Sequence, residues 1–205
     1  METNLDCRGL ACPGPVLACK KCVEENAPAT LTVTVDNQAA RENVTRFLSM
    51  HGYTVTVETA GDLFTLQATA TGAPAAPQAA PAPKPRATGD AQATPKTAVF
   101  ITADTVGRGD AELGAKLMVN FVNTLPELGE GLWRIILVNG GVKLAVAGSP
   151  VLERLQEMSA SGVSILVCGT CLDFFGILDQ KGVGETTNML DVVTSLDLAD
   201  KVIQI

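Results

Sequence analysis

Residues 71–96 read TGAPAAPQAAPAPKPRATGDAQATPK, and this stretch decides the fold because it divides the chain in two. Six of the chain's 11 prolines fall here, spaced mostly by alanine, and bulky apolar side chains are almost absent. A segment of this composition cannot bury a core and is typical of an extended linker. We therefore expect one domain over 1–70, a Pro/Ala-rich flexible linker over 71–96, and a second domain over 97–205.

The residues before the linker have the pattern of a small α/β domain. Strands are indicated by alternating stretches rich in β-branched residues, such as LTVTV at 31–35, and helices by apolar residues at helical spacing. The predicted strands are 5–11, 31–35, 53–58 and 63–68, and the predicted helices are 13–25 and 39–50. The order βαβαββ predicts a two-layer sandwich, with one sheet and two helices on one of its faces.

The residues after the linker predict a larger α/β domain. Strands are expected at 98–102, 133–138, 163–168 and 201–205, and helices at 109–125, 150–160, 172–178 and 187–196. The helix over 109–125 is expected to turn five apolar residues inward: Leu113, Leu117, Met118, Phe121 and Val122. Strands that alternate with helices predict a doubly wound parallel sheet, an α/β/α domain with helices on both faces.

Composition excludes several classes of function. The formal net charge of −7 argues against a protein that neutralises nucleic-acid phosphates. No stretch approaches the roughly 20 apolar residues that span a bilayer, and METNLDCRGL lacks the pattern of a secretory signal. We therefore expect a cytoplasmic protein, where six cysteines are not expected to be disulfide staples.

The motif around Cys12 is the first chemical candidate. A predicted strand ends and a helix begins within Leu10–Pro15, and Pro13 suits the first helical position. Cys12 would then lie at the helix start, where unpaired N–H groups and the helix dipole stabilise a thiolate or a persulfide anion. Arg8 could add a positive charge. The alternative is a buried structural cysteine at a turn, and the residues alone leave both interpretations open.

A second candidate is Cys168-Gly169-Thr170-Cys171, at the end of a predicted parallel strand. Open α/β sheets place their sites at the carboxyl ends of strands. A C-x-x-C there could cycle between dithiol and disulfide, or accept and resolve a sulfur atom, whereas two core cysteines beside a turn would be inert. The loop ends at Asp104, Asn139, Gly140 and Gly141 could line the same site. The remaining cysteines, Cys7, Cys19 and Cys22, are expected to pack in the first domain.

Both halves resemble proteins of sulfur relay. The stretch DCRGLACPGPVLACKKCVEE, with its Cys-Pro-x-Pro core, is similar to the TusA/SirA sulfur carriers, which implies a persulfide on Cys12. Residues 98–205 resemble the DsrE-like fold, through GRGDAELG (107–114), LVNGGVKL (137–144) and VCGTCLDFFG (167–176). A TusA-like domain followed by a DsrE-like domain is the layout of the YedF family, which is associated with selenium metabolism.

This resemblance implies a carrier of sulfur or selenium rather than a multiple-turnover enzyme, with sulfurtransferase activity left open. The chalcogen would sit covalently on Cys12, and Cys168 and Cys171 would form a second thiol site, with no other cofactor. The implied partners are a cysteine desulfurase or another donor and a downstream acceptor protein, with no nucleic acid, no membrane, and a homo-oligomer through the C-terminal domain as an option.

Three alternatives remain at this stage. The first is a dithiol redox sensor or oxidoreductase centred on Cys168 and Cys171. The second is a metal-binding module that uses Cys19 and Cys22 together with Cys168 and Cys171 as four thiolates. The third is a regulatory partner without chemistry of its own.

Overall fold

The computed structural model describes residues 2–71 and 94–205. The chain divides into two compact units, Met1–Thr88 and Gly89–Ile205. The expected linker over 71–96 lies outside the described residues except at its two ends. None of the helices in the described parts is long and apolar enough to cross a membrane.

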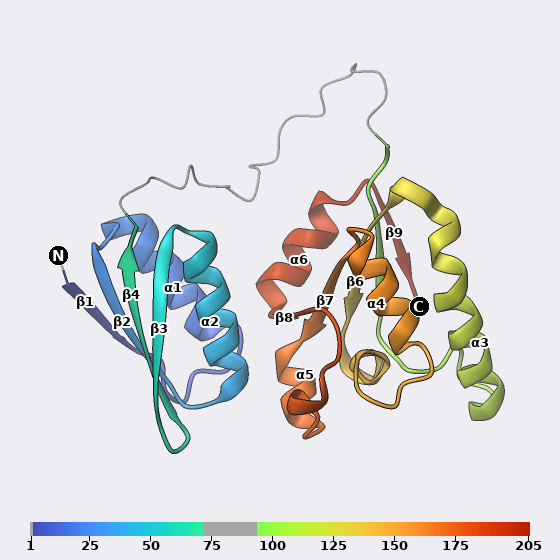
Figure 1. Ribbon diagram of the computed structural model, residues 1–205, viewed down its shortest axis with the longest axis horizontal. Coiled ribbons are helices and arrows are strands. Elements are labelled where there is room, and N and C mark those ends of the chain that lie inside the picture. The colour runs from blue at the N-terminus through green and yellow to red at the C-terminus, as the bar shows by residue number, and fades with distance from the viewer. Residues whose placement is uncertain (1, 72–93) are drawn as a thin grey trace. The chain divides into compact units, whose positions relative to one another are not determined.

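Unit 1 is a two-layer α/β sandwich, as predicted (Figure 1). Its sheet has the order β1-β2-β4-β3, in which β1 runs parallel to β2 and the other neighbours are antiparallel. Both helices cover one face of this sheet. The elements are β1 (Glu2–Asp6), α1 (Gly14–Asn26), β2 (Thr30–Val35), α2 (Gln38–Met50), β3 (Tyr53–Ala60) and β4 (Leu63–Ala70).

Alternation in β2 explains how the sheet meets its helices. Leu31, Val33 and Val35 are at most 1% exposed, while the threonines between them are half-buried. The helix α2 begins where the Asn37 side chain accepts the backbone N–H of Ala40, a common N-cap. It ends before Gly52, whose φ of 81° lies in the left-handed region that glycine tolerates.

The start of unit 1 differs from the sequence prediction. The first strand was expected over 5–11, but β1 ends at Asp6, and residues 7–13 form a loop that we call the Cys12 loop. The Cys7 N–H still bonds to Thr34 O, and the chain then turns through Gly9, whose φ is 70°. The helix α1 starts at Gly14, so Pro13 is its N-cap rather than its first residue.

Unit 2 is a doubly wound parallel domain, as predicted. Its five strands are all parallel, in the order β8-β7-β6-β5-β9. The elements are β5 (Thr97–Ile101), α3 (Ala111–Thr124), η1 (Leu125–Gly131), β6 (Leu132–Leu137), η2 (Asn139–Ala145), α4 (Leu152–Ala160), β7 (Ser164–Cys168), α5 (Gly169–Phe174), η3 (Leu178–Gln180), β8 (Glu185–Thr187), α6 (Met189–Leu198) and β9 (Lys201–Gln204).

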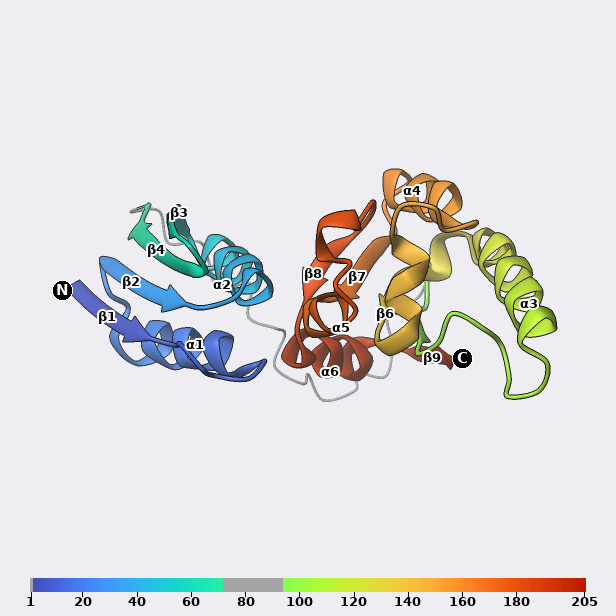
Figure 2. The same ribbon diagram turned by 90° about the horizontal axis from the view of Figure 1, so that it is seen from below.

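The connections place helices on both faces of this sheet. The crossovers from β5 to β6 and from β6 to β7 run in one direction, and right-handed connections then put α3 and α4 on the same face. The return from β8 to β9 crosses in the opposite direction and puts α6 on the other face (Figure 2). The buried core between these layers is built from apolar strand residues such as Ile135, Ile136 and Val167.

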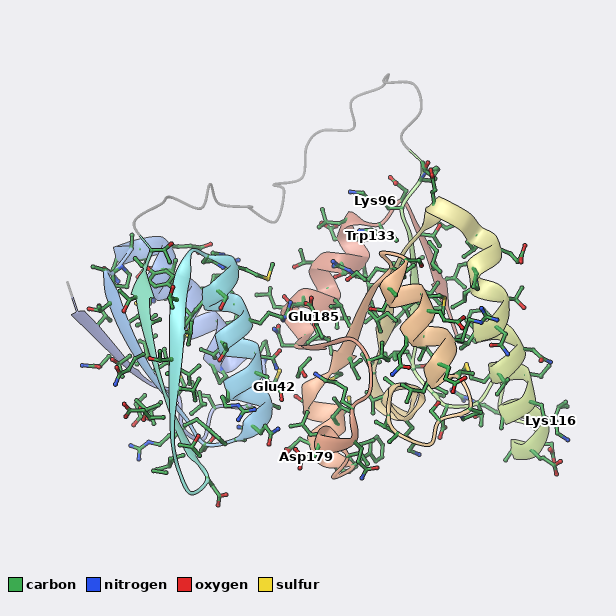
Figure 3. All side chains as sticks on the ribbon, in the orientation of Figure 1. Glu42, Lys96, Lys116, Trp133, Asp179 and Glu185 are labelled. Atoms are coloured by element: carbon green, nitrogen blue, oxygen red, sulfur yellow. The ribbon has the colours of Figure 1, made fainter. Side chains whose placement is uncertain are left out.

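Polar contacts tie the sheet to α6. The Arg134 guanidinium donates to Ser164 Oγ at 3.1 Å and to Ser195 Oγ at 2.6 Å. It also lies over the Trp133 ring, 4.4 Å from the centroid, and the Lys96 ammonium approaches the same ring (Figure 3). These contacts show that Arg134 and Ser164 point toward the face of the sheet that α6 covers.

Some of the predictions for unit 2 were wrong. Leu113 and Leu117 are 56% and 42% exposed, although both were expected inward. Met118 and Val122 are buried as predicted, and Gly114 shares their face because it lets the helix approach the backbone at Val106. The short strand β8 was not predicted. Helix α6 begins two residues after the predicted start at 187, and α4 begins after 150.

Candidate functional site

Cys12 is exposed at the start of α1. It directly precedes the N-cap residue Pro13, which confirms the predicted placement beside a helix start. No side chain caps this end of α1; the Gly14 N–H bonds to Ala11 O and the Leu17 N–H to Pro13 O. The helix start therefore presents its positive dipole end beside the Cys12 loop.

Two carboxylates hold the Cys12 loop. Asp36, at the end of β2, accepts the Gly9 N–H at 2.6 Å and so ties the loop to the neighbouring parallel strand. Asp6 binds the Arg8 guanidinium through two contacts of 2.6 and 2.8 Å. The side-chain and backbone hydrogen bonds from Arg8 lower the pKa of the Asp6 carboxyl to about 2. Arg8 is thus directed at Asp6, whereas the sequence left its direction open.

The other three thiols of unit 1 are buried. Cys7, Cys19 and Cys22 are 1%, 0% and 6% exposed. Burial raises the pKa of all three thiols, that of Cys19 to about 12 with further contributions from Cys7 and Cys22. Protonated, buried thiols are poor nucleophiles, and their burial agrees with the expected packing role. Unit 1 therefore combines one exposed thiol with three buried ones.

Cys168 and Cys171 come together at the carboxyl end of β7, as predicted. Their Sγ atoms are 3.0 Å apart and no disulfide joins them. Cys168 is 5% exposed, whereas Cys171 is only half-buried on the first turn of α5. The backbone N–H of Asn139, at the start of η2, donates to Cys171 Sγ at 3.1 Å. The more accessible sulfur therefore also receives a backbone donor.

Sequence reasoning missed the polar residues next to this pair. Thr187, at the end of β8, is in register with Cys168 and fully buried, and its hydroxyl donates to Asp191 Oδ2 at 3.1 Å. The Asn188 side chain donates to the same oxygen at 2.8 Å. The residues 187–191 were read as the start of a helix, so a strand end was not considered there.

The other predicted loop residues divide between two places. Asn139 contacts Cys171, but Asp104 pairs with Lys143 at 3.2 Å in an open pocket of about 620 Å³. Phe175 also lines this pocket, and neither cysteine does. The double glycine serves packing, because a Cβ on Gly141 would come within 2.5 Å of a backbone oxygen in β5.

The four-thiolate metal site receives no support from this geometry. Among the residues that the structure describes, no group of three or more cysteine, histidine, aspartate or glutamate side chains could hold a metal ion. Cys19 and Cys22 are buried in the core of unit 1, and the Cys168/Cys171 pair belongs to unit 2.

Comparison with known families agrees with the two units. Residues 3–68 match the family described as Sulfurtransferase TusA. Residues 91–205 match the DsrE/DsrF-like family. Each match spans the thiol site of its own unit, Cys12 in the first and the Cys168/Cys171 pair in the second.

Individual relatives follow the same division. A candidate sulfur carrier protein of Methanocaldococcus jannaschii is 47% identical over 53 residues, which cover 25% of this chain and 71% of that protein. A SirA-like protein from Desulfitobacterium hafniense is 30% identical and covers 33% of this chain and 96% of its own, with a TM-score of 0.31. The ychN protein from E. coli is 19% identical and covers 54% of this chain and 99% of its own, with a TM-score of 0.43. The chain belongs to the family of proteins that join a TusA domain to a DsrE-like domain, as in YedF.

Proposed function

We propose that the protein relays sulfur or selenium as a persulfide, or its selenium equivalent, on Cys12, with Cys168 and Cys171 as a second thiol site. The TusA and DsrE-like domains support the role in sulfur relay. The observation that carries the assignment to Cys12 is its exposure beside an uncapped helix start, while the other three thiols of unit 1 are buried.

The loading step is a transfer of one sulfur atom. The Cys12 thiolate attacks the outer sulfur of a donor persulfide, a new S–S bond forms on Cys12, and the donor cysteine leaves as a thiolate. The start of α1 stabilises the negative charge before and after the transfer. A cysteine desulfurase is the expected donor, because its own product is a cysteine persulfide.

The second site can accept the chalcogen or release it reductively. Cys171 is the accessible sulfur and Cys168 lies 3.0 Å from it, close enough to form a disulfide after a small movement. Both thiol sites are on one chain, so their encounter is intramolecular and does not depend on protein concentration. The same proposal includes a downstream acceptor protein, action in the cytoplasm and a role in selenium metabolism. It also includes assembly through the C-terminal domain.

Loading by a cysteine desulfurase with cysteine tests the proposal. Intact-mass spectrometry should show one added sulfur on the wild-type chain and none on Cys12→Ala, while Cys22→Ala should load like the wild type. The added mass should disappear on treatment with a reductant. An absence of added sulfur on the wild-type chain, or equal loading of Cys12→Ala, would contradict the assignment.

A dithiol oxidoreductase is the second candidate, favoured by the short Sγ–Sγ distance alone. It predicts a disulfide between Cys168 and Cys171 that equilibrates with a glutathione buffer near the cytosolic potential. A pair that stays reduced under mild oxidant, or one whose potential lies far below the glutathione pool, would count against this candidate.

A further inference from the structure

Thr187 and Asp191 lie where they can act on Cys168. Side chains alternate along a strand, so Ser164, Leu166 and Cys168 share one face of β7. Ser164 binds Arg134, which also binds Ser195 of α6, and this face is therefore the one that α6 covers. Thr187 is paired in register with Cys168 on the adjacent parallel strand, about 4.8 Å away.

The Thr187 hydroxyl is hydrogen-bonded to a carboxylate. It is completely buried and donates to Asp191 Oδ2, on the same α6 face of the sheet. A hydroxyl that donates one hydrogen bond keeps two acceptor lone pairs, so it can also accept a proton from a thiol. Asn188 fixes the Asp191 carboxylate through a contact of 2.8 Å. The order Cys168, Thr187, Asp191 is that of a proton path from a buried thiol to an acceptor.

We propose that Cys168 is the resolving thiol of the pair and that Asp191, acting through the Thr187 hydroxyl, accepts its proton. This deepens the proposed function and rests on its assignment of Cys168 and Cys171 as a thiol pair. Asp191 is a positioning residue in this proposal, because the proposed proton path runs from the sulfur to Asp191 through Thr187.

The resolving step is balanced in atoms and electrons. Cys168 Sγ attacks Cys171 Sγ, whose bond to the outer sulfur of a persulfide breaks as the disulfide forms. The thiol proton passes to Thr187 while the Thr187 proton passes to Asp191, and the outer sulfur leaves as hydrosulfide. The outer sulfur gains the two electrons that the two cysteines lose. An external thiol reductant then restores the dithiol.

Asp191 is the carboxylate bonded to Thr187, but other charged groups lie on the surrounding elements. These are Arg134 of β6, Lys143 of η2, Asp173 of α5, Lys181 before β8, Glu185 of β8, and Asp197 of α6. Arg134 binds Ser164 and Ser195, Lys143 binds Asp104, and Lys181 binds Thr186. Asp173, Glu185 and Asp197 are exposed.

The test uses glutathione disulfide as the probe and needs no persulfide. In full-length Cys12→Ser protein, the accessible Cys171 attacks the probe to give a mixed disulfide, and Cys168 then expels glutathione. Acid quenching followed by intact-mass spectrometry measures the lifetime of the mixed disulfide from pH 6 to pH 9. Because Cys12 is absent, failure of this proposal is distinguishable from failure of the carrier assignment.

Loss of the proton path should slow resolution. Thr187→Val and Asp191→Asn should each lengthen the mixed-disulfide lifetime by about tenfold or more at pH 7, since general-base assistance commonly contributes at least that much. The difference should shrink as the pH rises, because hydroxide increasingly replaces the carboxylate as the base. Thr187→Ser should restore the wild-type rate, and Asp197→Asn on the same helix should resemble the wild type.

Two results would overturn the proposal. One is a wild-type lifetime in both Thr187→Val and Asp191→Asn across the whole pH range. The other is faster resolution in Asp191→Asn at pH 7, which would mean that the carboxylate only disfavours the thiolate. Thermal unfolding of each variant shows whether it is folded. If Asp191→Asn is unstable, Thr187→Val still decides the question, because valine closely matches threonine in shape.

Discussion

Cys12 and the Cys168/Cys171 pair present sulfur in different ways. Cys12 is an exposed thiol on a loop that leads directly into the uncapped start of α1. Cys171 is half-buried, receives a backbone N–H from Asn139, and has a second, buried sulfur 3.0 Å away. A single exposed thiol suits collection and delivery, because no neighbouring thiol discharges it. A pair suits release, because the second sulfur can displace whatever the first has accepted.

Removing either cysteine of the pair is expected to have the largest effect, which is the loss of sulfide release. Cys168→Ser and Cys171→Ser should both load sulfur on Cys12 normally, and both should lose sulfide release almost completely. Only Cys168→Ser should accumulate added sulfur on Cys171, because its resolving partner is missing. Sulfide assays and peptide mass mapping measure the two outcomes, and undiminished release from Cys168→Ser would contradict the division of roles.

Alkylation should separate the exposed thiol from the buried ones. Thiolates are the reacting species, and burial raises the pKa of Cys7, Cys19 and Cys22 while also blocking access. At pH 8, iodoacetamide should modify Cys12 about tenfold or more faster than any of these three. Peptide mapping over time checks the order. The same measurement in denaturant is the control, since unfolding should make the four rates similar.

Gly141→Ala should destabilise unit 2 and leave unit 1 intact. The added methyl group would lie 2.5 Å from Ile101 O, so the backbone must shift, at a cost of about 1–3 kcal/mol. Gly109→Ala is the matched control, because no atom lies within 4 Å of its Cβ position, and should change stability by less than about 0.5 kcal/mol. Urea unfolding followed by the fluorescence of Trp133 reports on unit 2, and equal effects of the two variants would contradict the packing role.

Asp36→Ala should have the smallest effect, confined to the Cys12 loop. It removes the acceptor of the Gly9 N–H and should cost about 1 kcal/mol. A less ordered loop should slow sulfur loading on Cys12 severalfold while leaving the glutathione reaction of the Cys168/Cys171 pair unchanged. Asp62→Asn, in the exposed turn between β3 and β4, serves as the control. Wild-type loading in Asp36→Ala would show that the loop needs no such anchor.

Sequence patterns predicted the architecture better than the surroundings of each thiol. Strong alternation, as at Leu31, Val33 and Val35, and unbroken apolar runs predicted most strands, because burial on one or both faces imposes those patterns. The three-residue strand β8 was too short to give a pattern. On α3, Met118 and Val122 were predicted correctly as buried, but Leu113 and Leu117 were not. The helix packs closest at Gly114, which has no apolar side chain to indicate that face.

The candidate thiols were visible in the sequence, but most of their partners were not. The Cys-Pro-x-Pro motif and the C-x-x-C spacing identify residues that are close along the chain. Asn139 was predicted at the second site and contacts Cys171. Asp36 and Thr187 reach the sulfur sites from other elements, through strand order and register that local sequence does not specify. Only the general rule that parallel strands gather loops at their carboxyl ends could have indicated these positions.

A pulse of labelled sulfur, whose position in the wild-type chain is mapped at successive times, tests the central claim most directly. After brief loading by a desulfurase, peptide mapping should find the label first on Cys12 and later as free sulfide, with a Cys168–Cys171 disulfide formed in step with its release. In Cys12→Ser, labelling of Cys171 should be strongly slowed. Early labelling of Cys171 at the same rate with and without Cys12 would contradict the account, because Cys12 would then not be the carrier.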